Sequence, residues 1–546
     1  LEKYGWTTFD QLDMNYRKSG FDVSAMLYGG NLRNGSDQIF TVDTYLDKQW
    51  QQYMDMTDQK SKAQQMEAVL SANYQFDENH TLGARYEFER TPKANWYINQ
   101  FAQTYCDDLP YEDLHSYISD NEPETSHKSN LYYNGKIKAW SIDFNADGLW
   151  TETKNRQTAN EDVIGSVEDS ADRSVTTLDT KRNELYAAKL VVSHPFAKGE
   201  LSLGAEYSHN KRNTTFFNEE GIIDNDEAMI KEGSTSAFVE YAKIFHKLQV
   251  QAGLRYEHVG FDYYDAGKFV PEQSKTYHNL FPSLTFSFPL KNVQVQLGYA
   301  SDIQRPSYRD LRSNVVYANR YMYDTGNPFL MPSITNNVTL GASYKWVNLY
   351  VGYSHVKDPM IQQTVAYSDD DPTIALLTIY NEPAYDKLLA SISFSPTIGI
   401  WSPQLGIGIN KQWYESETPQ GKKKFGKPLG SLSFRNSFKL PAGFLLGLDG
   451  IWVSKGHQEN VYMNKTRMDW DASLYKSFLK DNLTIQLMAT NLFASKQDVN
   501  LYSGIRMMHN LQTFHRQVTL TLRYKFNSTK SKYKGTGAGE SQKSRM

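Results

Sequence analysis

The sequence predicts an all-β fold: a transmembrane antiparallel up-and-down β-barrel of the 22-strand type, with about 21 strands present. Three features support this fold class. Polar and apolar residues alternate along many segments, aromatic residues recur at the ends of those segments, and short connections alternate with long ones. A membrane-spanning helix is excluded, because the longest nearly uninterrupted apolar run, 443–448, is far shorter than the about 20 residues a helix needs.

The alternation is clearest in two segments, Leu248–Glu257 and Val293–Tyr299. Successive strand residues point to opposite faces, so the apolar side chains fall on one face and Gln, Gly, Arg and Glu fall on the other. The same pattern recurs in 201–207, 349–353, 405–409, 483–487 and 518–526. A soluble β-sandwich shows the same alternation, so other features must separate the two classes.

Aromatic residues make up 14% of the chain and often end an alternating segment, as at Tyr207, Tyr256, Tyr299, Tyr353, Phe394, Phe434, Tyr475 and Phe526. Transmembrane barrels place such rings in girdles at the two membrane interfaces. The segments are also long, often about 10 to 15 residues against a usual 5 to 6. Both features favour a membrane barrel.

The connections alternate in length along the chain. Short turns are expected near 18–20, 77–80, 139–140, 197–199, 246–247, 291–292, 345–346, 441–443 and 480–482. Long polar connections are expected at 93–126, 154–180, 213–228, 260–275, 306–333, 366–374 and 415–427. Outer-membrane barrels have short periplasmic turns and longer extracellular loops. A propeller would instead repeat a blade of about 40 residues.

Strand parity gives an expectation about what precedes the chain. The first strand runs from Trp6 into a short turn, and the last ends at Asn527 on the short-turn side, so the number of crossings is odd. Bacterial single-chain barrels have even strand numbers. We therefore expect 1–527 to be a barrel whose first strand, with a plug domain absent from this chain, lies upstream of Leu1. The alternative is an error of one in the strand count.

Composition narrows the remaining classes. Cys106 is the only cysteine, so no intrachain disulfide can form. A net charge of −4 is too balanced to suggest nucleic acid as a partner. The chain begins without a basic segment and an apolar stretch, so any secretion signal is already removed or was not included.

No catalytic set is visible. The sequence lacks HExxH, GxSxG and P-loop motifs, and its 12 His are scattered, so we expect no enzyme activity and no cofactor. The acidic runs 224–227 and 369–371 lack EF-hand spacing and are interpreted as solvated loops. A soft-metal site at Met54 and Met56 is the less favoured interpretation, so no metal site is predicted.

The predicted extracellular mouth contains the best binding candidates. Aromatic faces stack on apolar or sugar-like ligands, and Arg pairs with carboxylate or phosphate. The candidates are Trp96, Tyr97, Arg305, Tyr308, Arg309, Tyr317, Arg320, Tyr321 and Tyr323. The alternative interpretation, favoured for any single one of them, is packing of one loop on another.

Charged residues of both signs are expected to line the lumen, namely Glu206, Arg255, Glu257, Arg435, Lys439, Arg523 and Lys525, with Asp143 and Asp147. This suits a water-filled or plug-filled interior. The segment 528–546 carries several Lys and Arg separated by Gly and Ser, and we expect a flexible basic periplasmic tail.

Several motifs show a family resemblance. Asp302–Tyr308 contains an R-P-x-Y stretch, Asn327–Pro332 reads N-P-F-L-M-P, Asn491–Phe493 reads N-L-F, and the last strand is followed by KYKGTGAG at 532–539. Together they resemble the barrel of TonB-dependent receptors, in particular the outer membrane β-barrel family receptors of Bacteroidota. The acidic residue that commonly follows the second motif is Ser333 here, so a role for that carboxylate is absent. The resemblance covers about 6–527 and the tail.

The resemblance implies a cell outer-membrane receptor for TonB-energised uptake of a scarce nutrient: a metal chelate, oligosaccharide or peptide. Outer-membrane lipid would surround it, TonB would act only through a plug not present in this chain, and a surface lipoprotein or another outer-membrane protein would be an optional partner. The alternative is a passive diffusion pore or a structural barrel that binds a partner protein. A soluble adhesin is the third and least favoured interpretation.

Overall fold

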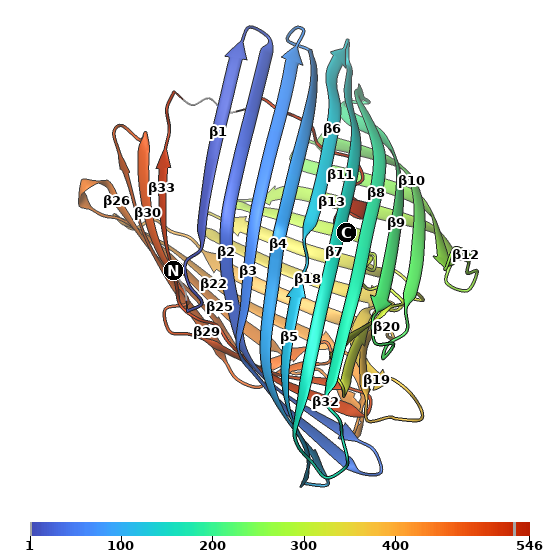
Figure 1. Cartoon of the computed structure of the whole chain (residues 1–546). Coiled ribbons are helices and arrows are strands. Elements are labelled where there is room, and N and C mark those ends of the chain that lie inside the picture. Colours follow the sequence, from blue (N-terminus) through green and yellow to red (C-terminus); the bar gives the residue numbers. More distant parts are fainter. Residues whose placement is uncertain (1–2, 528–530) are drawn as a thin grey trace.

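The computed structural model describes residues 3–527 and 531–546 (Figure 1). Leu1, expected on the long-loop side, and tail residues 528–530 lie outside the described residues. Within the described part, 21 strands pair antiparallel in chain order to form one wall. They are β1 (Thr8–Lys18), β2 (Phe21–Tyr45), β3 (Gln49–Gln75), β4 (His80–Cys106), β6 (Glu124–Ile137), β7 (Trp140–Ser166), β8 (Arg173–Phe196), β9 (Gly199–Asn218), β10 (Asp226–Phe245), β11 (Leu248–Asp265), β13 (Lys275–Leu290), β14 (Val293–Gln304), β17 (Ser333–Tyr344), β18 (Val347–Lys357), β21 (Tyr385–Phe394), β22 (Trp401–Trp413), β25 (Leu429–Lys439), β26 (Phe444–Val453), β29 (Arg467–Phe478), β30 (Leu483–Thr490) and β33 (Gln517–Tyr524).

Tight turns join the strands at one end of the wall. Two residues connect β8 to β9, Ala197 and Lys198, and both have a positive φ, 48° and 64°. His246, Lys291 and Lys345 also have positive φ in their turns. Such turns match the right-handed twist of the flanking strands. The meander and its short-turn end agree with the predicted fold class, which is confirmed.

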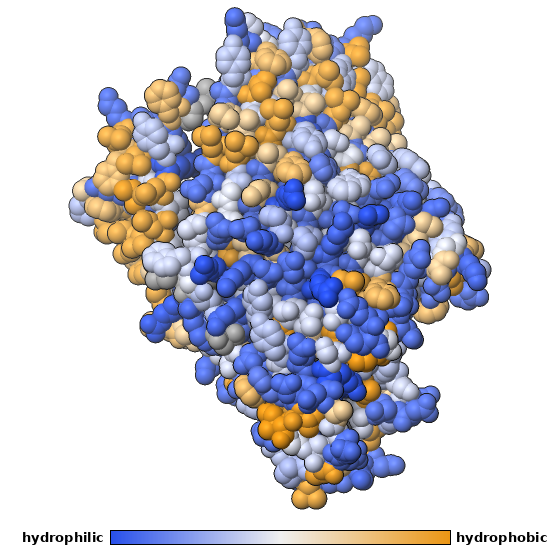
Figure 2. Space-filling model, viewed as in Figure 1, coloured by the Kyte–Doolittle hydropathy of each residue, from blue (hydrophilic) through white to orange (hydrophobic). Residues whose placement is uncertain are grey.

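The two faces of the wall differ in polarity. Leu254, Leu297, Leu432 and Leu520 point outward and are each about 40–60% exposed, as a lipid-facing surface requires. Figure 2 shows hydrophobic side chains gathered toward the end of the molecule that carries the short turns, and hydrophilic ones beyond them. No helix of the described residues is long and apolar enough to cross a bilayer.

One side of the wall is much taller than a membrane crossing requires. β3, β4 and β7 each have 27 residues, whereas a crossing takes about 9–11. The additional strand β5 (Leu109–Asn121) pairs with the parts of β4 and β7 that lie far from the short turns. We call this end of the wall the upper, extracellular end. The predicted long polar loops 93–126 and 154–180 are therefore wrong in detail, because most of their residues continue the ladder.

A small second sheet is formed by residues from the loops between β14 and β21. It contains β15 (Val315–Asn319), β16 (Met322–Thr325), β20 (Ala375–Asn381) and β19 (Met360–Ala366), with β16 and β20 parallel. The remaining short elements are β12 (Lys268–Phe269), β23 (Glu415–Thr418), β24 (Gly421–Lys424), β27 (Gly456–Gln458), β28 (Val461–Met463), a 3-10 turn at Pro441–Gly443 and the helix α1 (Glu540–Lys543).

The first and last barrel strands run in the same direction, each toward the short-turn end. The pairings of the described residues join β1 to β2 and β33 to β30, and none of them joins β1 to β33. Above the membrane the wall continues differently, since β31 (Lys496–Ser503) and β32 (Arg506–Thr513) form a hairpin that pairs with the upper part of β2.

The C-terminal segment does not extend into the periplasm as a flexible tail. Residues 531–546 turn back into the barrel and lie against the inward face of β6–β10, where Figure 1 marks the chain end. The expectation fails for this segment because inward-facing acceptors on the wall bind its backbone and the side chains of Lys543 and Arg545. The expected periplasmic location is corrected accordingly.

Candidate functional site in the extracellular mouth

The small sheet is packed inside the tall wall rather than standing above it. Tyr317 and Tyr323 are 1% and 3% exposed and pack in one apolar cluster with residues of the wall. Those wall residues are Ile118, Ala159, Val175 and Phe216, from β5, β7, β8 and β9. The alternation of these strands puts all four on the inward face, so the sheet occupies the mouth of the barrel.

A buried ion-pair network fastens this sheet to the wall. The side chain of Arg320 is 8% exposed and lies between the carboxylates of Glu112 and Glu161, at 3.2 and 3.1 Å. The backbone N–H of Arg320 also donates to Glu161, and Tyr317 Oη donates to Glu161 Oε2 at 2.8 Å. Tyr321 donates to Glu112.

Burial and the adjacent carboxylates raise the pKa of Tyr317, and the same two causes raise the pKa of Tyr321. Both phenols therefore stay protonated at physiological pH and remain hydrogen-bond donors to Glu161 and Glu112. Their polar atoms are committed to the wall, so these side chains hold the sheet in place. This placement corresponds to the alternative interpretation, in which one loop packs on another.

The group Arg305, Tyr308 and Arg309 lies at the start of the loop that follows β14, and most of it is buried inside the barrel. Arg305 forms an ion pair with Glu257 of β11, and Tyr308 is fully buried. Arg309 differs from its neighbours, because its side chain is 75% exposed and lies 3.6 Å from Asp324. Of this group, only Arg309 presents its charge to solvent.

Trp96 and Tyr97 are consecutive residues of β4, not loop residues as the sequence suggested. Both are half-buried, and their side chains point to opposite faces of the wall. Lys62 lies 5.9 Å from the centre of the Tyr97 ring. The structure therefore does not gather all nine predicted binding residues of the mouth at one place.

All but one of the predicted lumen residues lie on the inward face of a wall strand. In β25, Leu432 and Phe434 are exposed on the lipid side, so Arg435 and Lys439 point inward. The same reasoning places Glu206, Arg255, Glu257 and Arg523 on the inward face of their strands, whereas Lys525 lies one residue beyond the end of β33. Arg255 pairs with Glu257 at 3.2 Å and lies 3.7 Å from Glu206, so opposite charges meet on the wall.

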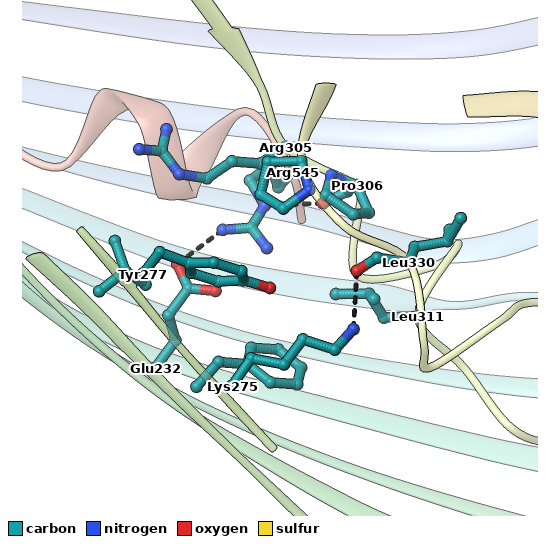
Figure 3. A pocket seen from close by; sticks show the side chains of 11 residues that line it. Glu232, Lys275, Tyr277, Arg305, Pro306, Leu311, Leu330 and Arg545 are labelled. Carbon is teal, nitrogen blue, oxygen red and sulfur yellow. Dashed lines mark hydrogen bonds and ion pairs between the residues drawn. The ribbon is translucent and has the colours of Figure 1, made fainter. Parts of the chain in front are cut away.

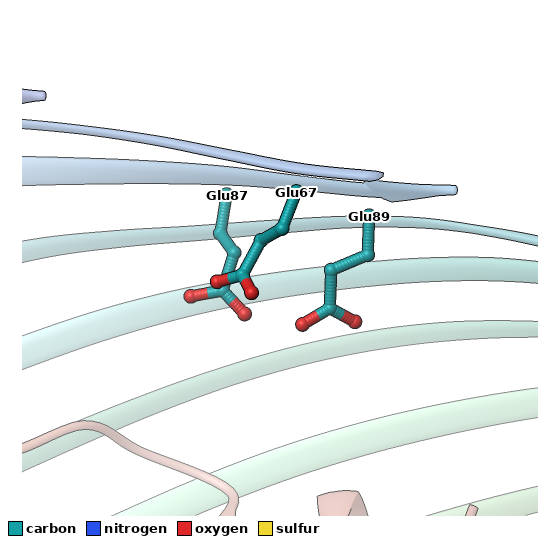
Figure 4. A group of neighbouring side chains, drawn as sticks. All are labelled: Glu67, Glu87 and Glu89. Carbon is teal, nitrogen blue, oxygen red and sulfur yellow. The ribbon is translucent and has the colours of Figure 1, made fainter. Parts of the chain in front are cut away.

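Three further carboxylates point into the lumen, and the sequence pattern alone does not indicate them. Glu67, Glu87 and Glu89 bring one oxygen each within 4.8 Å of one another (Figure 4). Lys128 donates to Glu87 and Glu89 at 2.8 and 2.9 Å, and Arg85 pairs with Glu87 at 2.7 Å. These cations compensate the carboxylates, so the arrangement is an ion-pair network.

A groove of about 800 Å³ lies at the rim near β22 and β23. It is lined by Lys411, Trp413, Lys422, Lys424, Lys427 and His457, together with Glu382, Glu415 and Glu417. Glu415 pairs with Lys422 and Lys424 at 3.2 and 3.4 Å. Burial, together with Lys423, Lys427 and Lys411, lowers the pKa of His457 to about 4. The histidine is therefore neutral at physiological pH.

Comparisons with known proteins bear on the fold. No curated protein matches the chain. The outer membrane transporter YddB from Escherichia coli is similar, with 10% identity, 91% of this chain and 76% of that chain covered, and a TM-score of 0.53. The FrpB iron transporter from Neisseria meningitidis (F5-1 variant) shows 12% identity over 95% and 83%, also with a TM-score of 0.53.

A mutant of the ferric enterobactin receptor PfeA from Pseudomonas aeruginosa, in complex with enterobactin, shows 12% identity over 93% of this chain and 80% of that chain, with a TM-score of 0.52. At these identities the similarity shows a shared barrel fold. The model of the outer membrane protein β-barrel family matches residues 134–524, most of the wall. The chain therefore belongs to the outer membrane protein β-barrel family and is a protein of the outer membrane.

Proposed function

We propose that this chain is the barrel of a TonB-dependent receptor that imports a scarce nutrient. The observation that carries the proposal is a barrel of 21 strands whose inward face holds charged residues of both signs, a lumen suited to a polar plug and a polar solute. The similar structures named above, an outer membrane transporter, an iron transporter and a ferric enterobactin receptor, support it.

The proposed substrate class is a metal chelate, with oligosaccharides and peptides as the other candidates. In this proposal the plug and one further strand precede the described barrel, and TonB acts through the plug. The strand directions support the extra strand, because β1 and β33 are parallel to each other and an antiparallel closure needs one strand between them. The barrel itself would carry no enzyme activity.

The placement of the mouth residues divides their proposed roles. Arg320, Tyr317, Tyr321 and Tyr323 would hold the small sheet in the mouth, as would Arg305 and Tyr308 for the adjoining loop. Arg309 and Trp96 keep accessible surface and are the proposed ligand contacts.

The test is uptake by cells that carry the full gene. A radioactive ferric catecholate chelate serves as the probe, followed by an oligosaccharide and a peptide mixture. We expect accumulation of one probe in cells with TonB and a loss of at least tenfold without it. Accumulation that does not depend on TonB, with an open conductance in planar bilayers, would contradict the receptor and favour a passive pore.

A further inference from the structure

The C-terminal segment 531–546 meets the inner wall through a continuous series of contacts. Near the short-turn end, the backbone N–H of Lys532 donates to Asp22 at 3.0 Å, and the Tyr533 ring packs edge-on against Tyr132 with centres 5.1 Å apart. At the other end of the segment, Arg545 reaches the loop that follows β14. The segment thus runs along the lumen between the two ends of the barrel.

The middle of the segment fits the wall through its backbone. The N–H groups of Thr536 and Gly537 donate to Asn145, each at 3.1 Å, and that of Ala538 donates to Asp147 at 3.1 Å. The N–H of Gly539 donates to Glu206 at 2.7 Å. Four consecutive donors thereby meet acceptors of the wall.

The structure explains why this segment contains glycines. Gly537 and Gly539 adopt φ of +76° and +69°, which strongly favour glycine. A Cβ atom on Gly539 would lie 2.7 Å from the Cβ of Ala187 in β8. The Gly-x-Gly-x-Gly pattern at 535–539 is therefore matched to the wall rather than being only a flexible spacer.

The segment ends in a pocket built for a guanidinium group (Figure 3). Arg545 is 7% exposed; its guanidinium donates to Glu232 at 2.6 Å and to the carbonyl of Pro306 at 2.8 Å. The ring of Tyr308 lies 4.3 Å from the guanidinium carbon. A carboxylate, a carbonyl and an aromatic face together suit the planar, charged Arg side chain better than Lys.

The pocket also connects the chain end to the extracellular loop. The N–H of Tyr308 donates to the carbonyl of Arg545 at 3.0 Å, and Arg305 donates to Ser541 at 2.7 Å. Met546 packs against the apolar cluster that contains Phe261 and Leu330. The loop that begins at Arg305 is therefore held by the C-terminal segment as well as by the wall.

We propose that the inner wall of the barrel carries a binding site for a basic, glycine-rich peptide with an anchoring arginine, and that residues 531–546 of the same chain occupy it as a lumenal strap. The strap joins the short-turn end of the barrel to the loop that follows β14. The site does not depend on the imported substrate or on TonB.

Cysteine cross-linking tests the position of the strap in the full protein in its membrane. In a Cys106→Ser background, Thr536→Cys is combined with Asn145→Cys, whose native side chains are 2.9 Å apart. The matched control combines Thr536→Cys with Ser473→Cys, which is on the inward register of β29. We expect at least tenfold more disulfide in the first pair. Equal yields, or no disulfide with either pair, would overturn the proposal.

Substitutions at the anchor test the guanidinium pocket with the same cross-link as readout. Arg545→Lys, Arg545→Ala and Glu232→Gln should each lower the yield at least fivefold, and Arg545→Glu with Glu232→Arg should restore part of it. Lys534→Ala, at an exposed position of the same segment, should leave the yield unchanged. Full cross-linking in Arg545→Ala would overturn the anchoring role of Arg545. Misfolding of this variant could not produce that result, because a misfolded barrel would lose the cross-link.

Discussion

At the residue scale, two arginines of one loop have opposite environments. Arg320 is 8% exposed and neutralises two carboxylates that are almost fully buried, Glu112 and Glu161. Arg309 is 75% exposed and lies 3.6 Å from Asp324. Removing one partner of a buried pair leaves an uncompensated charge, whereas an exposed pair is screened by water.

Replacing Arg320 with Ala should therefore destabilise the mouth by about 3–5 kcal/mol. Arg309→Ala should change the stability by about 0–1 kcal/mol. Hydrogen exchange of the amides in 315–325 measures the effect locally, and a urea titration measures it globally. Equal protection of these amides in the two variants would contradict the assigned role of Arg320.

The histidine in the rim groove gives a pH dependence with a definite sign. The folded protein holds the pKa of His457 at about 4, below the 6.5 of an ordinary histidine, because of burial and three nearby lysines. Between these two pH values the unfolded chain binds a proton at His457 that the folded chain does not bind. The free energy of unfolding of the segment around His457 therefore falls as the pH falls from 6.5 to 4. Above 6.5 the effect is absent.

An NMR titration of labelled His457 should show a midpoint near pH 4. Replacing Lys423 with Met removes a positive neighbour and should move the midpoint upward. A midpoint close to 6.5 in the unmodified protein would show that the ring is solvated.

At the element scale, alternation along a strand decides which side chains meet lipid. Leu297 is the fifth residue of β14 counted from its turn and is 41% exposed on the outward face, and Gln296 beside it points into the lumen. The same period assigns inward faces to Glu206, Arg255 and Arg435.

Leu297→Arg should cost about 2–4 kcal/mol, because a charge near the middle of the bilayer loses its hydration. Gln296→Arg places the same charge in the lumen and should cost much less. The two variants are compared by urea unfolding in lipid vesicles. A similar loss of stability in both would mean that the faces are assigned the wrong way round.

The sequence predicted the barrel within the membrane better than the structure above it. Inside the bilayer one face must be apolar, so the period of two is visible in β11 and β14. Above the bilayer the outer face of β4 and β7 meets water, and their buried inner face mixes apolar residues such as Ala159 with polar ones such as Glu161, so the alternation is weak and suggested loops. Arg320 is 208 residues from Glu112 along the chain, and spacing alone does not reveal such a pairing. The acceptors on the wall that order 531–546 are still farther away along the chain, by 313 to 510 residues.

At the scale of the whole molecule, the directions of β1 and β33 determine how the wall can close. They run the same way in a sheet whose other neighbours are antiparallel, so the proposed additional strand would have to run the opposite way between them. That strand would complete an even number, as in other bacterial single-chain barrels.

The product of the full gene should accordingly migrate faster on a denaturing gel when unheated than when boiled, because a closed barrel resists the detergent. Residues 1–546 expressed alone should lose most of that difference. If residues 1–546 show the same heat-dependent shift as the full product, the additional strand is not needed for closure.

The unequal height of the wall has a consequence for how large objects reach the mouth. Strands of 27 residues such as β3 and β7 measure about 90 Å along their length, and at a tilt of about 45° they rise roughly 60 Å, more than twice the apolar band of about 25 Å. On the far side of the barrel in strand order, β18 and β21 have only 11 and 10 residues, close to the length of a single crossing. A bulky carrier, such as a protein that delivers a solute, can therefore approach the mouth over the side with short strands. The tall side formed by strands such as β3 and β7 blocks its passage beyond the mouth.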